Sequence, residues 1–220
     1  MNAKGFNKDL RTIWLKLRID KDRELHFRVR GVGEPGYRED DEWMLIDFVV
    51  LEKDNYGYAV FGDESLTADE LEALEFMLDK AIAGKLKSSW WLYTIEQEFM
   101  ISVEMVKSKR FNLMEMATVY NKTKTFDIDE TRDYSVEPCL VIRDEIPYSC
   151  DDMCVKLYGG NLSRVSLYLK LVKGEISLED RRIRSMFRNG ILYRDDGRFR
   201  EKKKQLQQQQ EQEWRDRYNE

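Results

Sequence analysis

The stretch ESLTADELEALEFMLDKAIAGKLKSSWWLYTIEQEFMISVEM, residues 64–105, decides the fold, because it joins a capped amphipathic helix to two strand patterns. Thr67 and Glu70 have the T-x-x-E spacing of a capping box, in which each side chain accepts a backbone N–H at the helix start. Gly84 is suited to end the helix in a left-handed conformation. Residues at helical spacing predict a core-facing stripe, formed by Leu71, Leu74, Met77, Leu78, Ala81 and Ile82.

Strand patterns lie on both sides of this helix. Before it, apolar residues alternate with polar ones in residues 12–19 and 24–31, which predicts a hairpin of half-buried strands. Residues 42–52 and 55–62 predict two further strands, and the short connections favour an antiparallel sheet. After the helix, residues 89–95 and 98–106 return to strand pattern, and residues 110–120 favour a third strand.

The last third of the chain has a helical pattern. Residues 162–173 carry apolar side chains on one face, and a second capping box is expected from Ser177 and Asp180. The Gln-rich tail contains Leu206, Trp214 and Tyr218 as its sizeable apolar groups, so either a docked helix or a frayed end fits it.

The expected fold class is therefore α+β. It would consist of a mostly antiparallel sheet with one long capped helix packed on it, followed by a helical C-terminal part. We place a soft domain boundary near Pro138, giving residues 1–137 and 138–220, and a single domain stays open.

The composition and net charge of the chain limit the classes of partner that it can bind. The 220 residues are 42% hydrophobic and 36% charged, with a formal net charge of −5. An acidic chain disfavours nucleic acid or an anionic membrane as the main partner. No apolar run reaches the roughly 18 residues that span a bilayer, and the first residues lack the apolar segment of a secretory signal. We expect a cytoplasmic protein.

Catalytic and metal-binding motifs are missing from the sequence. The three cysteines are Cys139, Cys150 and Cys154, and the single histidine, His26, is far from them, so neither a zinc site nor any cofactor is expected. His26 is interpreted as an exposed strand residue rather than a general base. Phosphate-binding loops and nucleophile motifs are absent. An Asp/Glu acid–base pair stays open, although a non-enzymatic role is favoured.

Two features are candidates for partner binding. The first is an acidic loop, which is either a solvated turn or a patch that meets a basic partner surface; it contains Glu39, Asp40, Asp41 and Glu42. The second is the pair Trp90 and Trp91, which point to opposite faces of a strand, so that one is expected in the core and the other exposed as an anchor. The arginines of residues 181–188 leave nucleic acid as a minor option.

The order of these elements resembles the WapI-type immunity proteins of bacterial polymorphic toxin systems. In that family a helix of the form L-T-x-x-E-L-x-x-L-x-x-x-L-x-x-L-L-x-G-K-L precedes a strand like F-I-E-P-x-L-x-F. The resemblance covers about residues 43–106, and Gln97 stands where the family usually has proline. The matching positions are Leu66, Thr67, Glu70, Leu71, Leu74, Leu78, Gly84, Lys85, Leu86, Ile95, Glu96 and Phe99.

The resemblance implies a small α+β protein without catalytic machinery that neutralises a cognate toxin by direct binding. This is the leading functional hypothesis. A phage or mobile-element accessory protein, acting in anti-defence or assembly through protein contacts, is the alternative, and a carboxylate-based hydrolase is the third. The oligomeric state is open.

Overall fold

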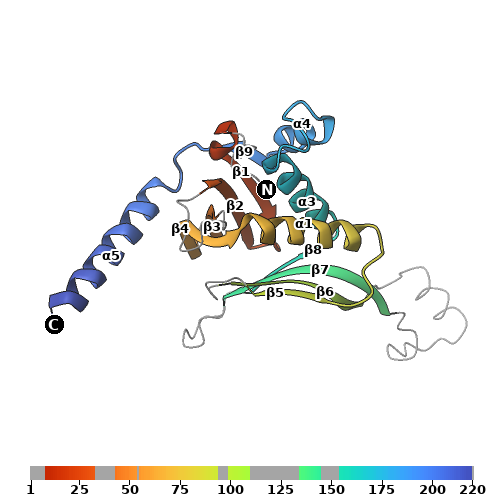
Figure 1. Cartoon of the computed structure of the whole chain (residues 1–220), viewed down its shortest axis with the longest axis horizontal. Coiled ribbons are helices and arrows are strands. Elements are labelled where there is room, and N and C mark those ends of the chain that lie inside the picture. The colour runs from red at the N-terminus through yellow and green to blue at the C-terminus, as the bar shows by residue number, and fades with distance from the viewer. Residues whose placement is uncertain are drawn as a thin grey trace, which may run out of the picture. The chain divides into compact units, whose positions relative to one another are not determined.

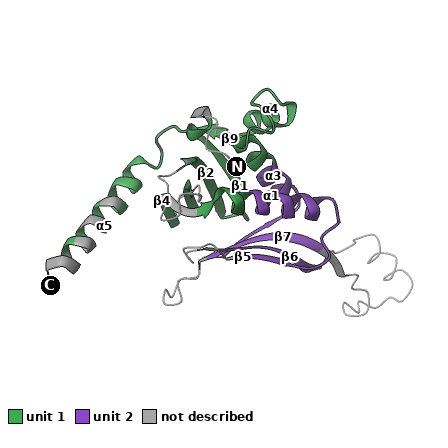
Figure 2. Ribbon diagram, in the orientation of Figure 1, with its two compact units in different colours: residues 1–71, 167–220 green, residues 72–166 purple. Residues whose placement is uncertain are grey.

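The computed structural model describes residues 8–32, 43–53, 55–93, 99–109, 134–144 and 154–219 (Figure 1). The chain forms two compact units, shown in green and purple in Figure 2. Unit 1 comprises residues 1–71 and 167–220, and unit 2 comprises residues 72–166. This division differs from the boundary expected near Pro138, because Pro138 lies within a strand of unit 2 that pairs it with Met105.

Unit 1 contains a five-stranded antiparallel sheet in the order β4-β3-β2-β1-β9, preceded by the short helix η2 (Lys8–Thr12). The strands are β1 (Ile13–Arg18), β2 (Arg23–Val32), β3 (Trp43–Glu52), β4 (Asn55–Thr67) and β9 (Leu192–Arg194). The four successive strands predicted before the long helix are confirmed. Strand β9 was not predicted, because three residues are too few to show a period.

The β1–β2 hairpin is closed by Asp20. Its Oδ1 accepts hydrogen bonds from the backbone N–H groups of Asp22 and Arg23, both at 2.9 Å. A short acidic side chain that bonds the backbone ahead of it stabilises a turn without help from the core. These local bonds therefore close the hairpin that the alternation of its two strands predicts.

Helix α1 (Ala68–Ile82) has the predicted capping box. The Thr67 N–H donates to Glu70 Oε2 at 2.7 Å, and the Glu70 N–H donates to Thr67 Oγ1 at 3.2 Å. Gly84 ends the helix with φ of +67°. One expectation about its core-facing stripe is wrong, because Ile82 is 44% exposed. The carboxylate residue Glu75 is only 5% exposed.

Unit 2 contains a four-stranded antiparallel sheet in the order β5-β6-β7-β8. The strands are β5 (Trp90–Tyr93), β6 (Phe99–Lys109), β7 (Tyr134–Asp144) and β8 (Cys154–Tyr158). Figure 2 shows the unit 2 portions of α1 and α3 (Gly160–Val172) close together, and Ser166 Oγ donates to Asp79 Oδ1 at 2.7 Å between them. The strand favoured for residues 110–120 lies outside the described residues.

The C-terminal part is helical, as expected, with α4 (Arg181–Arg188) and α5 (Arg200–Asn219) after α3. The capping box of Ser177 and Asp180 is wrong. Asp180 is itself the N-cap and accepts the N–H of Arg182 at 2.8 Å. Ser177 Oγ accepts the Glu179 N–H instead, at 3.3 Å. The α+β fold class is confirmed.

One face of the unit 1 sheet is apolar and covered by the end of α3. Tyr168 is fully buried there, and its hydroxyl accepts the Val29 N–H at 3.0 Å and donates to the Ile13 carbonyl at 3.2 Å. The phenol therefore fixes α3 to two strands with both hydrogen bonds satisfied.

The alternating pattern of β1 predicts that Trp14 lies on a solvated face, and this expectation is wrong. Trp14 is 1% exposed. It is covered by Phe199, which follows β9, with ring centroids 5.0 Å apart. Burial of Trp14 therefore depends on a residue that lies 185 positions later in the chain.

Candidate functional site

The residues proposed for partner binding are only partly described by the structure. The loop with Glu39, Asp40, Asp41 and Glu42 lies outside the described residues. Trp90 is partly buried and pairs with Val103, whereas Trp91 is 44% exposed with the Arg143 guanidinium 5.9 Å from its ring centre. The two tryptophans thus differ in exposure, and both belong to unit 2.

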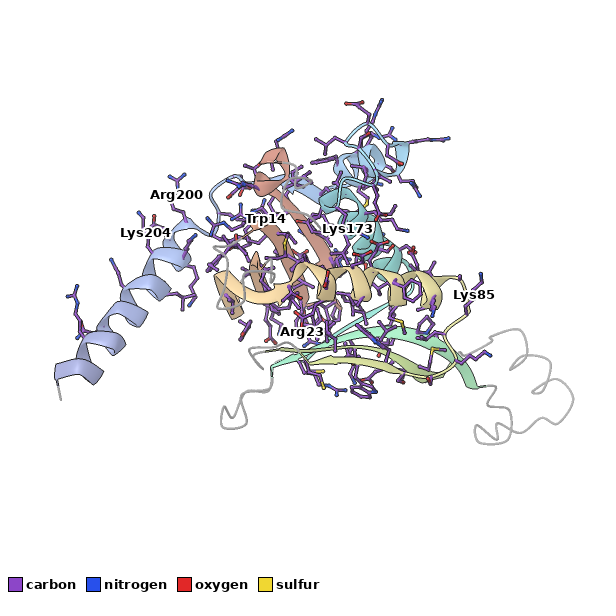
Figure 3. All side chains as sticks on the ribbon, in the orientation of Figure 1. Trp14, Arg23, Lys85, Lys173, Arg200 and Lys204 are labelled. Carbon is purple, nitrogen blue, oxygen red and sulfur yellow. The ribbon has the colours of Figure 1, made fainter. Side chains whose placement is uncertain are left out.

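A cleft of about 700 Å³ lies in unit 1, on the sheet face that carries Trp14. Figure 3 shows Arg200 at the start of α5 and Trp14 on the sheet of the same unit. The cleft is lined by five cationic residues, two aspartates, apolar side chains and two glycines: Arg11, Arg28, Arg30, Arg200, Lys203, Asp195, Asp196, Trp14, Leu45, Phe61, Phe199, Gly31 and Gly197. Residues from both ends of the chain therefore build one site.

Arg28 organises the floor of the cleft. Its Nε and Nη2 both donate to Asp47 Oδ2, the first at 2.8 Å, and its Nη1 donates to Asp195 Oδ2 at 2.6 Å. Its guanidinium carbon lies 4.2 Å from the centre of the Trp14 ring. Arg28 is 7% exposed and Asp47 is fully buried. This network fixes the loop after β9 to the sheet.

Two glycines let arginine side chains approach the backbone at the cleft wall. Gly31 has φ of +147°, and a Cβ there would lie 3.3 Å from Arg11 Nε. Gly197 has φ of +79°, and a Cβ there would lie 3.4 Å from Arg200 Nη2. The positive φ angles favour glycine, and its missing side chain leaves room for both guanidinium groups.

Three of the five cations have no carboxylate partner in the described part of the chain: Arg11, Arg200 and Lys203. Arg30 has only a long contact, 3.8 Å from its Nη1 to Asp47 Oδ1. Burial, and next the charge of Arg30, lower the pKa of Lys203. Positive charge therefore exceeds negative charge around the cleft.

The two carboxylates that line the cleft, Asp195 and Asp196, already accept hydrogen bonds from arginine side chains. Burial raises the pKa of Asp195, but hydrogen bonds from the Gly197 N–H and from Arg28 outweigh it, so the pKa lies below its usual value. Hydrogen bonding to Arg198 lowers the pKa of Asp196 to about 2. A carboxylate with a depressed pKa is a weak proton carrier near neutral pH, so these groups suit a structural role better than acid–base chemistry.

His26 is fully buried beside the cleft, which corrects the expectation of an exposed side chain. Its Nδ1 lies 2.8 Å from Tyr193 Oη, while its Nε2 lies 3.6 Å from Glu24 Oε2. Phe199 packs edge-on against the imidazole at 5.2 Å between ring centroids. Burial, followed by the charge of Lys16, lowers the pKa of His26 to about 4.

This buried histidine predicts a loss of stability in mild acid. The unfolded chain takes up a proton near pH 6.5 and the folded chain only near pH 4, so protonation favours the unfolded state as the pH falls between these values. The free energy of unfolding should drop by about 2 kcal/mol from pH 7 to pH 5.

Urea unfolding at several pH values measures this slope. His26→Gln, which carries no titrating group, should flatten it. The carboxyl groups with lowered pKa values titrate below this window, so they do not mask the effect. An unchanged slope in the His26→Gln protein would contradict the assignment to His26.

Other site types find no support in the described part of the chain. There, no group of three or more His, Cys, Asp or Glu side chains is placed to hold a metal ion. None of the described helices has the length and apolarity needed to cross a membrane. Comparison of the chain with known protein families, curated proteins and solved structures found no match.

Proposed function

We propose that this protein is a non-catalytic binding protein and that its cleft holds an anionic group of its ligand. The observation that carries the proposal is that the aspartates of the cleft form ion pairs, whereas three of its cationic side chains do not within the described part of the chain. Arg11, Arg200 and Lys203 lack carboxylate partners among the described residues, whereas Asp47 and Asp195 are tied to Arg28. Unpaired cations on a rigid floor attract and orient an anion.

Binding suits this arrangement better than catalysis. A hydrolase based on two carboxylates needs one acid with a raised pKa. In the cleft, the pKa values of Asp195 and Asp196 are lowered instead. The one histidine is buried, with its pKa lowered to about 4, and it faces Tyr193 rather than open solvent.

The biological role we propose is immunity. The resemblance of residues 43–106 to WapI-type immunity proteins supports a cytoplasmic inhibitor that binds a cognate toxin. Exposed Trp91 is a suitable aromatic anchor for such a partner. The preceding residue of β5, Trp90, is partly buried and is proposed to support this contact. The acidic residues 39–42 remain proposed contacts for a basic surface of the toxin.

A capture experiment tests this function with two matched variants. The cleft variant carries Arg11→Gln, Arg200→Gln and Lys203→Gln. The surface variant carries Arg181→Gln, Arg188→Gln and Lys204→Gln, which remove the same charge from exposed positions outside the cleft. Tagged wild-type protein, expressed in its native host, is expected to retain one stoichiometric partner with a toxic domain.

The cleft variant should retain at least tenfold less of this partner, and the surface variant should match the wild type. A toxin that the cleft variant retains equally well would contradict a role for the cleft. Recovery of only the protein itself as a defined oligomer, or of virion or defence-system components, would contradict immunity and favour the accessory-protein alternative.

A further inference from the structure

We propose that the anionic group bound in the cleft is a phosphate dianion carried by a small organic ligand of about nucleotide size. The inference rests on the proposed function in that both require an anion in this cleft. It names a small phosphate ligand, rather than a side chain of the toxin, as the occupant of the cleft, so that toxin capture depends on the cleft through the bound ligand. The chemical class of this ligand follows from the charge, the donor groups and the dimensions of the site.

Charge is the first argument. Five cationic residues line the described part of the cleft, and the carboxylates around them are Asp195, Asp196 and the buried Asp47. Asp196 is already paired with Arg198, so five minus two leaves three positive charges. A single carboxylate of a protein partner would neutralise one of them. A phosphate monoester carries about −1.5 to −2 at pH 7 and neutralises up to two.

The type and placement of the donors is the second argument. Arg11 and Arg200 each present a planar fork of N–H groups, which matches two phosphate oxygens at once. Gly31 and Gly197 keep space beside these guanidinium groups. Lys203 adds a point charge from one turn further along α5. All three donors line the same cleft, and a phosphate offers them three terminal oxygens.

The size and the wall of the cleft indicate an organic ligand rather than a free ion. A volume of about 700 Å³ lies within the range of roughly 300–1,000 Å³ that is typical of small-molecule sites. Phe61 and Leu45 are only partly buried beside the cations, and offer an apolar surface to the remainder of the ligand.

An unsatisfied donor supports the presence of an acceptor. Trp14 lines the cleft, and its indole Nε1 is buried with no hydrogen-bond partner among the described residues. Buried donors without a partner are rare in native proteins. An acceptor group on a bound ligand would account for this one.

A bound anion is also expected to affect the stability of the first turn of α5. Helix N-termini favour negative charge, yet α5 begins with one acidic residue, Glu201, among four cations at positions 200 and 202–204. Arg200 and Lys203 line the cleft in this first turn. A phosphate bound between them would offset the repulsion, so ligand binding is expected to stabilise the beginning of α5.

Calorimetric titration of the full chain tests the inference. The ligands are inorganic phosphate, pyrophosphate, a nucleoside monophosphate and diphosphate, the unphosphorylated nucleoside, citrate, a Glu-rich peptide and a short single-stranded oligonucleotide. The nucleoside phosphates should bind most tightly, and the nucleoside should not bind. The cleft variant should bind them at least about a hundredfold more weakly, because each lost charge-assisted contact costs roughly tenfold. The surface variant should stay within about twofold of wild type.

The outcomes separate the two proposals. Binding of the Glu-rich peptide or citrate, lost in the cleft variant, without binding of any phosphate, would overturn the phosphate assignment and keep the proposed function. A tighter, cleft-dependent complex with the oligonucleotide would overturn a small ligand. If no anion binds in the titration, and the cleft variant captures the toxin as well as the wild type does, both proposals are overturned. Far-ultraviolet circular dichroism of each variant shows whether it is folded.

Discussion

Replacing Asp47 with alanine is expected to lower the free energy of unfolding by about 3–5 kcal/mol. The Asp47 side chain is fully buried and binds Arg28 through two guanidinium nitrogens. Its removal leaves the guanidinium of Arg28, itself 7% exposed, with Asp195 as its remaining close carboxylate. A buried charge that loses its main partner keeps the cost of desolvation without the compensating attraction.

Urea unfolding followed by tryptophan fluorescence measures this change. Glu52→Ala is a suitable control, because Glu52 is an exposed carboxylate on the same strand, and its loss should change stability by less than about 0.5 kcal/mol. A loss below about 1 kcal/mol for Asp47→Ala would mean that Arg28 does not depend on this partner.

Replacing Trp14 with alanine is expected to cost a similar amount, about 3–5 kcal/mol. The Trp14 ring is 1% exposed and packs with Val49 and Phe199 at the centre of its cluster. It also stacks on Tyr193, with ring centroids 6.4 Å apart, and supports the Arg28 guanidinium. The substitution therefore opens a cavity and removes a cation–π contact at once.

Two comparisons make this result specific. Trp14→Phe should cost clearly less than alanine, because phenylalanine keeps most of the apolar contact and removes the unpaired indole N–H. Trp91→Ala, at a position that is 44% exposed, should cost less than about 1 kcal/mol. Equal losses for Trp14→Ala and Trp91→Ala would contradict the packing described for the cleft.

Elements with local causes could be predicted from the sequence. The capping box of Thr67 and Glu70 and the Asp20 turn depend on residues at most three positions apart. Strand alternation is likewise visible within a few residues. The hairpin, the long helix and the α+β class could therefore be predicted without knowledge of the tertiary structure.

The cleft could not be predicted in this way, because its contacts join distant parts of the chain. Arg28 and Asp195 are 167 positions apart, as are His26 and Tyr193. The alternation of β2 places His26 and Arg28 on the same face of the strand, but it does not show that Phe199 covers this face. One feature of the sequence does indicate a buried charge pair. Asp47 interrupts an otherwise apolar strand, and a lone charge there requires a buried partner.

The central claim is that an anion binds at Arg11, Arg200 and Lys203, and nuclear magnetic resonance tests it most directly. The arginine Nε–Hε signals of the full chain would be followed during titration with inorganic pyrophosphate and assigned through Arg11→Gln and Arg200→Gln. Arg11 and Arg200 should shift in a saturable manner, while Arg181 and Arg188 on α4 stay in place. Shifts of Arg181 and Arg188 without any change at Arg11 and Arg200 would contradict the assignment of the cleft as the binding site.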